Sequence, residues 1–167
     1  MKKRNIFWQT LGLAFILTVG LMVAGCANSD TAGDGETDVK EIPVATIVDQ
    51  INETYPLAGA DVLTEDLYES VYQLTADMVQ EAKIIVPLMN VKSNELAGVL
   101  AKPGQVDAVK EALAARQQAV CQTFQQYLPD QYEIAQKGEI VVRGNYVFLV
   151  MLEDNASAIE IIDSYLK

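Results

Sequence analysis

Histidine is absent from this 167-residue sequence, and basic residues are few. Without imidazole, the sequence excludes His-ligated zinc sites and both Ser-His-Asp and Cys-His catalysis. Twelve Lys and Arg residues stand against 23 Asp and Glu residues, which gives a formal net charge of −11. Because such a charge repels phosphate, nucleic acid is excluded as a partner.

The motifs of several common catalytic and ligand sites are missing too. The sequence has no glycine-rich phosphate loop, no Gly-x-Ser-x-Gly turn, no zinc-ligand spacing and no calcium loop. We therefore predict no metal and no cofactor, and we assign no catalytic residue. A non-enzymatic role is favoured, although catalysis stays open.

The N-terminus combines a basic start with a long uncharged segment. Met1-Lys2-Lys3-Arg4 is followed by twenty residues without charge, Ile6 to Gly25, which is long enough to span a bilayer. The segment ends in Val23-Ala24-Gly25-Cys26, and small residues before a cysteine suit a signal peptidase. This ending resembles the lipobox of bacterial lipoproteins, and an uncleaved anchor helix is the alternative.

That resemblance implies cleavage between Gly25 and Cys26, a thioether-linked diacylglycerol on Cys26, and palmitate in the lipid anchor. The first charges after Cys26 are acidic, and Lys40 is the first basic residue. Since cytoplasmic flanks collect Lys and Arg, we expect the remainder to face outside the cytoplasm, attached to the cell membrane through Cys26.

The chain divides into three predicted parts. Residues 1–25 form the signal peptide, and residues 26–41 form the lipidated cysteine and a flexible acidic stalk with too few apolar residues to pack. Residues 42–167 form a single domain. Lipidation of Cys26 leaves Cys121 alone, and its neutral surroundings indicate packing rather than chemistry.

Apolar residues at helical spacing predict four helices. The first holds Val44 to Ile51 and closes at Tyr55-Pro56. The second has Thr64 as N-cap and continues to Leu74, and the third, about six turns long, runs from Val106 through Tyr127 and closes near Pro129. Asp154 or Asn155 caps the last, in which Ala158, Ile161, Ile162 and Tyr165 face inward.

Four β-rich runs predict two antiparallel pairs. Lys83–Val91 pairs with Glu95–Lys102, and Pro87 indicates that the first of these strands lies at an edge or carries a bulge. Glu139–Arg143 and Tyr146–Leu152 form a hairpin around Gly144-Asn145, a type II′ turn, and the second strand is central. The sequence therefore predicts an α+β fold: an antiparallel sheet of about four strands, with the long helix and shorter helices packed mainly on one face.

Several segments together resemble a known family. These are Leu88-Met89-Asn90, a helix bearing Arg116, the run from Phe124 to Tyr132, and Gly144 to Leu149. The combination resembles a family of small Gram-positive lipoproteins classed as a domain of unknown function, over roughly residues 60 to 153. The resemblance implies a lipid-anchored extracytoplasmic domain and transfers no catalytic or binding residue.

Arg116 departs from its surroundings because it lies near the apolar stripe of the long helix. If it is half-buried, its guanidinium needs a carboxylate or several carbonyl groups. Two interpretations stay open: an internal ion pair that joins helix to sheet, or a recognition point for an anionic group. Tyr127 and Tyr132 are predicted at the edge of the core rather than on a binding platform.

Two functions remain. The first is a binding or protein-interaction module of the cell envelope, for an envelope protein or a small solute. The second is a hydrolase of envelope polymers that uses a carboxylate pair, for which Glu65/Asp66 and Glu153/Asp154 are the adjacent pairs. We favour the module, since these acids sit where helix caps and turns place them. Oligomeric state cannot be predicted from the sequence.

Overall fold

The computed structural model describes residues 41–167. The predicted signal peptide, the Cys26 lipidation site and nearly all of the predicted stalk lie outside these residues. Within the described part, no helix combines the length and apolar character needed to cross a membrane.

The α+β class is confirmed, with a sheet of five strands that is antiparallel throughout. The strand order is β1-β2-β3-β5-β4. In chain order, the elements are α1 (Val44–Thr54), β1 (Ala60–Val62), the short 3₁₀ helix η1 (Glu65–Leu67), α2 (Tyr68–Tyr72), β2 (Val79–Pro87), β3 (Glu95–Ala101), α3 (Val106–Phe124), α4 (Pro129–Gln136), β4 (Glu139–Arg143), β5 (Tyr146–Met151) and α5 (Asn155–Leu166).

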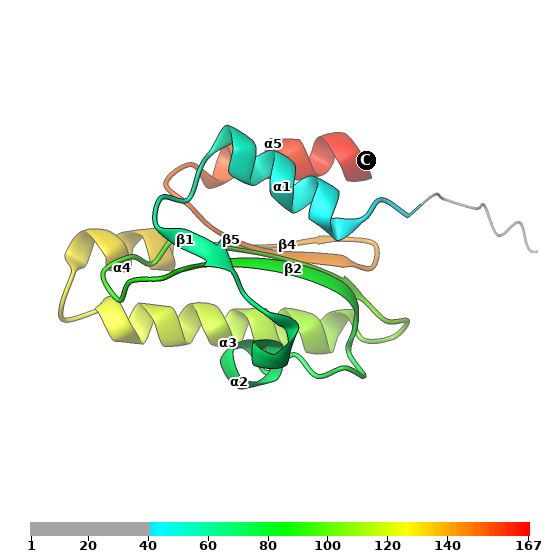
Figure 1. The fold of residues 1–167 in the computed structure, drawn as a ribbon, viewed down its shortest axis with the longest axis horizontal. Coiled ribbons are helices and arrows are strands. Elements are labelled where there is room, and N and C mark those ends of the chain that lie inside the picture. The colour runs from blue at the N-terminus through cyan, green and yellow to red at the C-terminus, as the bar shows by residue number, and fades with distance from the viewer. Residues whose placement is uncertain (1–40) are drawn as a thin grey trace, which may run out of the picture. The chain divides into compact units, whose positions relative to one another are not determined.

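Helices cover both faces of the sheet, so the prediction that they pack mainly on one face is wrong. Figure 1 shows α1 and α5 side by side on one face and α3 and α2 on the other, and α4 packs against the same core as α3. Each face has its own core. One joins Leu113 and Phe124 of α3 to Leu149, and the other joins Ile47 of α1 and Ile162 of α5 to Phe148.

The amphipathic helices form where their apolar spacing predicts. The four residues of α1 predicted to face the core, namely Val44, Ile47, Val48 and Ile51, are fully buried. Asp154 is the N-cap of α5, where its carboxylate accepts a hydrogen bond from the Ser157 backbone N–H at 3.1 Å. Tyr127 lies beyond the end of α3 with 67% of its surface exposed, so its predicted place at the core edge is wrong.

The hairpin of β4 and β5 has the predicted two-residue turn. Arg143 pairs with Tyr146, and Gly144 has φ +56°, while Asn145 has no positive φ, the pattern expected of a type II′ turn. β5 lies between β3 and β4, and all six of its residues are buried, which confirms its central place.

The predicted position of the first strand is wrong by four residues. β2 begins at Val79 and ends at Pro87, because Leu88 to Val91 form an exposed loop. β2 is not an edge strand, since the unpredicted β1 pairs with it on the outer side. Its irregularity lies between Val79 and Glu81 rather than at Pro87. Pro87 is tolerated because it follows Ile85, the last residue that pairs with β3.

Two further differences concern helices. Residues 65–72 form η1 followed by α2, with no side-chain cap from Thr64, and the chain turns at Gln73, whose φ is +58°. Leu74 therefore follows the helix instead of continuing it. α4, which begins at Pro129, is an additional helix where only the end of the long helix was predicted.

Candidate functional site

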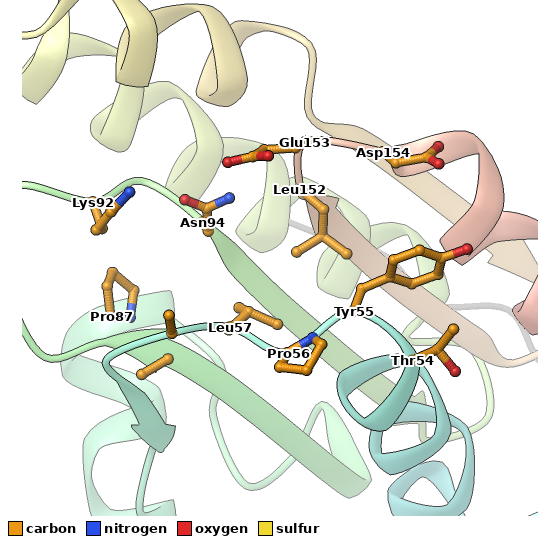
Figure 2. A pocket seen from close by; sticks show the side chains of 12 residues that line it. Thr54, Tyr55, Pro56, Leu57, Pro87, Lys92, Asn94, Leu152, Glu153 and Asp154 are labelled. Atoms are coloured by element: carbon orange, nitrogen blue, oxygen red, sulfur yellow. The ribbon is translucent and has the colours of Figure 1, made fainter.

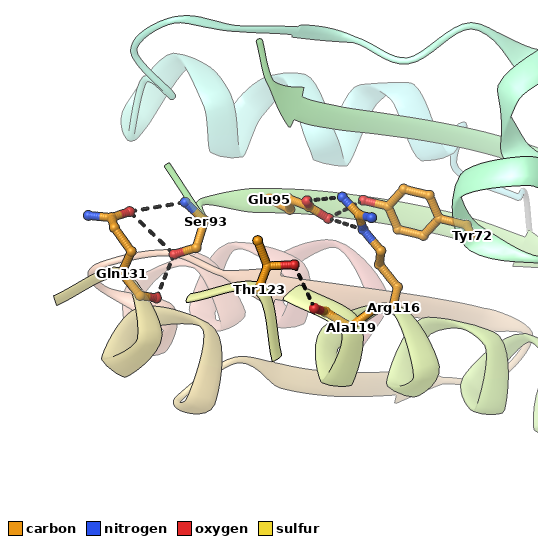
Figure 3. A network of polar contacts seen from close by, with 7 residues as sticks. All are labelled: Tyr72, Ser93, Glu95, Arg116, Ala119, Thr123 and Gln131. Carbon is orange, nitrogen blue, oxygen red and sulfur yellow. Dashed lines mark hydrogen bonds and ion pairs between the residues drawn. The ribbon is translucent and has the colours of Figure 1, made fainter. Parts of the chain in front are cut away.

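Arg116 of α3 meets Glu95, the first residue of β3, across the interface between helix and sheet (Figure 3). Its Nε donates to Glu95 Oε2 at 2.9 Å, and its Nη2 donates to Oε1. The Tyr72 hydroxyl donates to the same Oε2 at 2.6 Å. The Glu95 carboxylate is thus held by three hydrogen bonds while only 1% of the residue is exposed.

Tyr72 and Arg116 also contact each other directly. The guanidinium carbon lies 5.2 Å from the centre of the Tyr72 ring, a cation–π distance. Burial, followed by the charge of Glu95, raises the pKa of Tyr72 well above its ordinary value. Burial also opposes the charge on Arg116, but the hydrogen bonds and charge of Glu95, followed by the contribution of Tyr72, together outweigh it and raise the pKa of Arg116.

This network engages Nε and Nη2 of the Arg116 guanidinium. The Glu95 carboxylate takes the position that an anionic ligand would take on Arg116. Among residues 41–167, no buried side-chain N or O atom lacks a hydrogen-bond partner. The arrangement therefore joins α2, α3 and β3 through buried, fully hydrogen-bonded polar groups.

Sequence reasoning missed Glu95 and Tyr72. One signal was present for Glu95, which is the only charged residue in the otherwise apolar strand Glu95–Ala101. Such a residue needs a partner of opposite charge when it is buried. Its partner is 21 positions away along the chain, and no local pattern links the two.

A second buried polar contact fixes the loop between β2 and β3. The Ser93 hydroxyl donates to the Gln131 backbone carbonyl of α4 at 2.8 Å, and the Ser93 N–H donates to Gln131 Oε1 at 3.0 Å (Figure 3). At the other end of the loop, the Leu88 N–H donates to the Gly59 carbonyl at 2.9 Å.

This fixed loop carries exposed apolar side chains. Leu88 is 69% exposed, Met89 53% and Val91 44%. We call Leu88–Val91 the apolar loop. These side chains contribute little to the core, and neighbouring exposed apolar residues often mark interaction sites.

A groove of about 370 Å³ adjoins the apolar loop (Figure 2). Four segments line it: the α1–β1 connection, the end of β2, the β2–β3 connection and the β5–α5 connection. Its polar groups include Lys92 and Asn94 on one side and Tyr55 on the other, and Leu57 and Leu152 add apolar surface. The volume falls within the range of small-ligand pockets.

The two adjacent acid pairs lie in different places. Glu153 and Asp154 line the groove, but both Asp154 oxygens accept hydrogen bonds from Ser157. The side-chain hydrogen bond of Ser157, followed by its backbone N–H, lowers the pKa of Asp154. Glu65 and Asp66 line a separate hollow beside α2 and the start of β2.

Gly25 and Cys26 lie outside the described residues. Cys121 on α3 is partly buried against the core, and burial raises the pKa of its thiol, which disfavours the reactive thiolate. Tyr132 is partly buried against the same core. No group of three His, Cys, Asp or Glu side chains in the described part of the chain is placed to hold a metal.

Residues 59–152, more than half of the chain, match the family described as a domain of unknown function, DUF4358. The chain therefore belongs to this family. No curated protein and no solved structure matches it. The matched region holds all five strands, the Arg116–Glu95–Tyr72 network and the apolar loop, whereas α1 and α5 lie outside it.

Proposed function

We propose that this DUF4358 protein is a lipid-anchored binding module on the outer side of the cytoplasmic membrane, which binds another envelope component through the apolar loop and the adjoining groove. The observation that carries the proposal is the order of signals at the N-terminus: basic residues, twenty uncharged residues and then Val23-Ala24-Gly25-Cys26. Two or more acyl chains on Cys26 hold a protein stably on a bilayer.

β2 runs from the place where the chain enters the domain, at Glu41, to the apolar loop. The two therefore lie at opposite ends of this strand. Near that point, Gln80 Nε2 donates to the Glu41 carboxylate at 3.0 Å, and the Ala45 N–H donates to Glu81. Leu88 follows Glu81 by seven residues of nearly continuous strand, about 23 Å at 3.3 Å per residue. Figure 1 shows the start of α1 and the β2–β3 connection at opposite ends of the domain.

The apolar loop therefore lies at the end of the domain opposite the point where Glu41 enters it. The loop is held by hydrogen bonds at both ends, Leu88 to Gly59 and Ser93 to Gln131. A preformed loop loses little conformational entropy when it binds. Apolar side chains on such a loop support a protein partner more than the membrane itself.

The hydrolase is the weaker alternative. A general acid on a glycosidase needs a raised pKa, and it needs a second carboxylate in the same cleft. The pKa of Asp154 is shifted in the opposite direction, and its oxygens are engaged by Ser157. The groove therefore supports binding better than acid catalysis.

Two measurements test the proposal. Mass spectrometry of membrane-extracted protein should find an N-terminal peptide that begins at Cys26 and carries a diacylglycerol, and Cys26→Ser should abolish both the lipid modification and the cleavage before residue 26. An intact Met1 with an unmodified Cys26 would contradict the anchor.

A photo-crosslinking amino acid at position 88 tests the binding surface on intact cells. It should yield a discrete adduct with an envelope protein, whereas the same group at the exposed position 111 on α3 should not. Equal labelling at the two positions would contradict the assignment of the apolar loop.

A further inference from the structure

The two edges of the sheet differ in how their outward backbone groups are satisfied. At β1, the Val62 N–H donates to the Asp61 carboxylate at 2.7 Å, and the Ala60 N–H donates to the Leu57 carbonyl at 3.2 Å. β1 also has only three residues. Short strands with such local contacts resist pairing with another chain.

β4, at the other edge, lacks these features. A two-residue turn makes Arg143 and Tyr146 a hydrogen-bonded pair. Because hydrogen-bonded pairs alternate along an antiparallel ladder, the backbone groups of Val141 and Glu139 also form hydrogen bonds with β5. The N–H and C=O groups of Ile140 and Val142 therefore point outward, away from β5. Within residues 41–167, one of these outward groups has a hydrogen-bond partner: the Val142 carbonyl accepts from Arg143 Nη1 at 2.8 Å. A carbonyl oxygen can accept a second hydrogen bond.

The side chains of β4 also suit pairing. Its central residues Ile140, Val141 and Val142 are β-branched, and the strand has neither proline nor lysine, which commonly protect an edge. We propose that β4 pairs antiparallel with β4 of a second copy of this chain, with Val141 on the two-fold axis. The two five-stranded sheets then become one continuous sheet.

This register follows from the outward groups. With Val141 on the axis, Ile140 of each copy lies opposite Val142 of the other, so that their outward N–H and C=O groups form four hydrogen bonds. The same register places Glu139 of each copy opposite Arg143 of the other. Arg143 uses Nε on Asp163 and Nη1 on Val142, which leaves its Nη2 donors for the exposed Glu139 of the second copy.

The self-complementary charge pattern is the reason to choose a second copy over a foreign strand. Glu and Arg lie at equal distances on either side of Val141, so a copy of the same strand supplies the opposite charge at both ends. One five-residue strand makes a small interface, and the pair is therefore weak in dilute solution. Lipid anchoring, which rests on the proposed function, would raise its local concentration.

Cysteine cross-linking of the full chain in membranes tests this register. In a Cys121→Ala background, Val141→Cys places two thiols on residues about 4.5 Å apart between Cα atoms, within the 4.4–6.8 Å range of disulfides. Mild oxidation should give a dimer linked between the two substituted positions. Val62→Cys, on the more exposed β1 edge, is the control for dimers that form by random collision. Its yield of disulfide-linked dimer should be several-fold lower.

Peptide mapping separates the pairing from the anchor. A disulfide between the two position-141 residues supports the β4 pairing, whatever the state of Cys26. Disulfides that involve Cys26 would contradict lipidation of Cys26 but not the pairing. In a folded variant, a yield no higher than that of Val62→Cys overturns the pairing.

A charge substitution supplies a test that does not disturb the buried residue Val141. Glu139→Arg places two arginines opposite each other and should lower the dimer fraction several-fold, as measured by sedimentation velocity of the full chain in detergent. Glu111→Arg makes the same charge change on the exposed surface of α3 and should leave the dimer fraction unchanged. A parent chain that stays monomeric at every concentration, or equal effects of the two substitutions, overturns the proposal.

Discussion

Glu95 and Arg116 form a two-point ion pair between the first residue of β3 and the middle of α3, with the carboxylate almost completely buried. The pair is asymmetric, because the Arg116 side chain keeps 24% of its surface exposed and the Glu95 side chain only 2%. Loss of the arginine therefore leaves the more buried charge without its counterion. Removal of Arg116 alone therefore lowers the free energy of unfolding by more than the intact ion pair contributes to it.

Arg116→Gln should lower the free energy of unfolding by roughly 3 kcal/mol, the low end of the range for broken buried pairs, since Arg116 is partly solvated. Urea denaturation measures the change. The double variant Arg116→Met, Glu95→Met should recover part of the loss, because no buried charge then remains. An Arg116→Gln variant as stable as the parent would contradict the structural role of the pair.

Tyr72→Phe should show an effect that depends on pH. Near pH 7 the variant loses the hydrogen bond to Glu95, a cost of about 1–2 kcal/mol. The folded-state pKa of Tyr72 is raised, so its contribution is complete below the unfolded value near 10 and is lost as the pH rises toward the folded value. The difference in stability between parent and variant should therefore shrink above about pH 10.

Urea denaturation at several pH values between 7 and 11 checks this prediction. The other tyrosines are common to both proteins, so their ionisation cancels in the comparison to first order. A stability difference that stays constant across this range would show that Tyr72 ionises in the folded protein as readily as in the unfolded chain.

Gly98 of β3 should not tolerate a methyl group. A Cβ atom there would lie 2.7 Å from Cγ atoms of both Val44 and Val48 on α1. Valine has one strongly preferred rotamer in a helix, so these atoms cannot simply rotate away. Gly98→Ala should therefore cost about 1–3 kcal/mol through overpacking.

A double-mutant cycle with Val44→Ala identifies the cause. Val44→Ala removes one of the clashing atoms, so Gly98→Ala should be less costly in that background than in the parent. Strict additivity of the two substitutions in thermal unfolding would indicate that the cost arises elsewhere, for instance from the conformational preference of glycine in the strand.

The sequence predicts the elements whose apolar pattern matches their burial. The four residues of α1 at helical spacing are all fully buried, and the β4–β5 hairpin has its turn at Gly144-Asn145. The missed β1 has three residues, too few for a period to be visible. The four-residue error in β2 arose because apolar character does not distinguish the buried Ile84 from the exposed Leu88.

The burial of the central strands explains why the prediction of helices mainly on one face of the sheet is wrong. β3 and β5 are buried along their whole length, as expected of strands covered on both faces. Two cores on opposite faces of the sheet therefore needed helices on both sides, and α1 and α5 supply the second helical layer from outside the family region. The partner of Arg116 could not be predicted in the same way, because Glu95 approaches it only after β3 and α3 have packed.

Leu88→Asp combined with Met89→Asp should separate binding from folding. Both side chains are mostly exposed, so the variant should unfold within about 0.5 kcal/mol of the parent, as is usual for surface substitutions. Capture of the envelope partner, measured by chemical cross-linking on intact cells, should be lost because charged groups replace the apolar contact. Leu113→Asp in the core is the contrasting control, since this fully buried residue should cost the fold itself. Unchanged capture by the double variant would show that the apolar loop is not the binding surface, and a large loss of stability would show that the loop has a structural role.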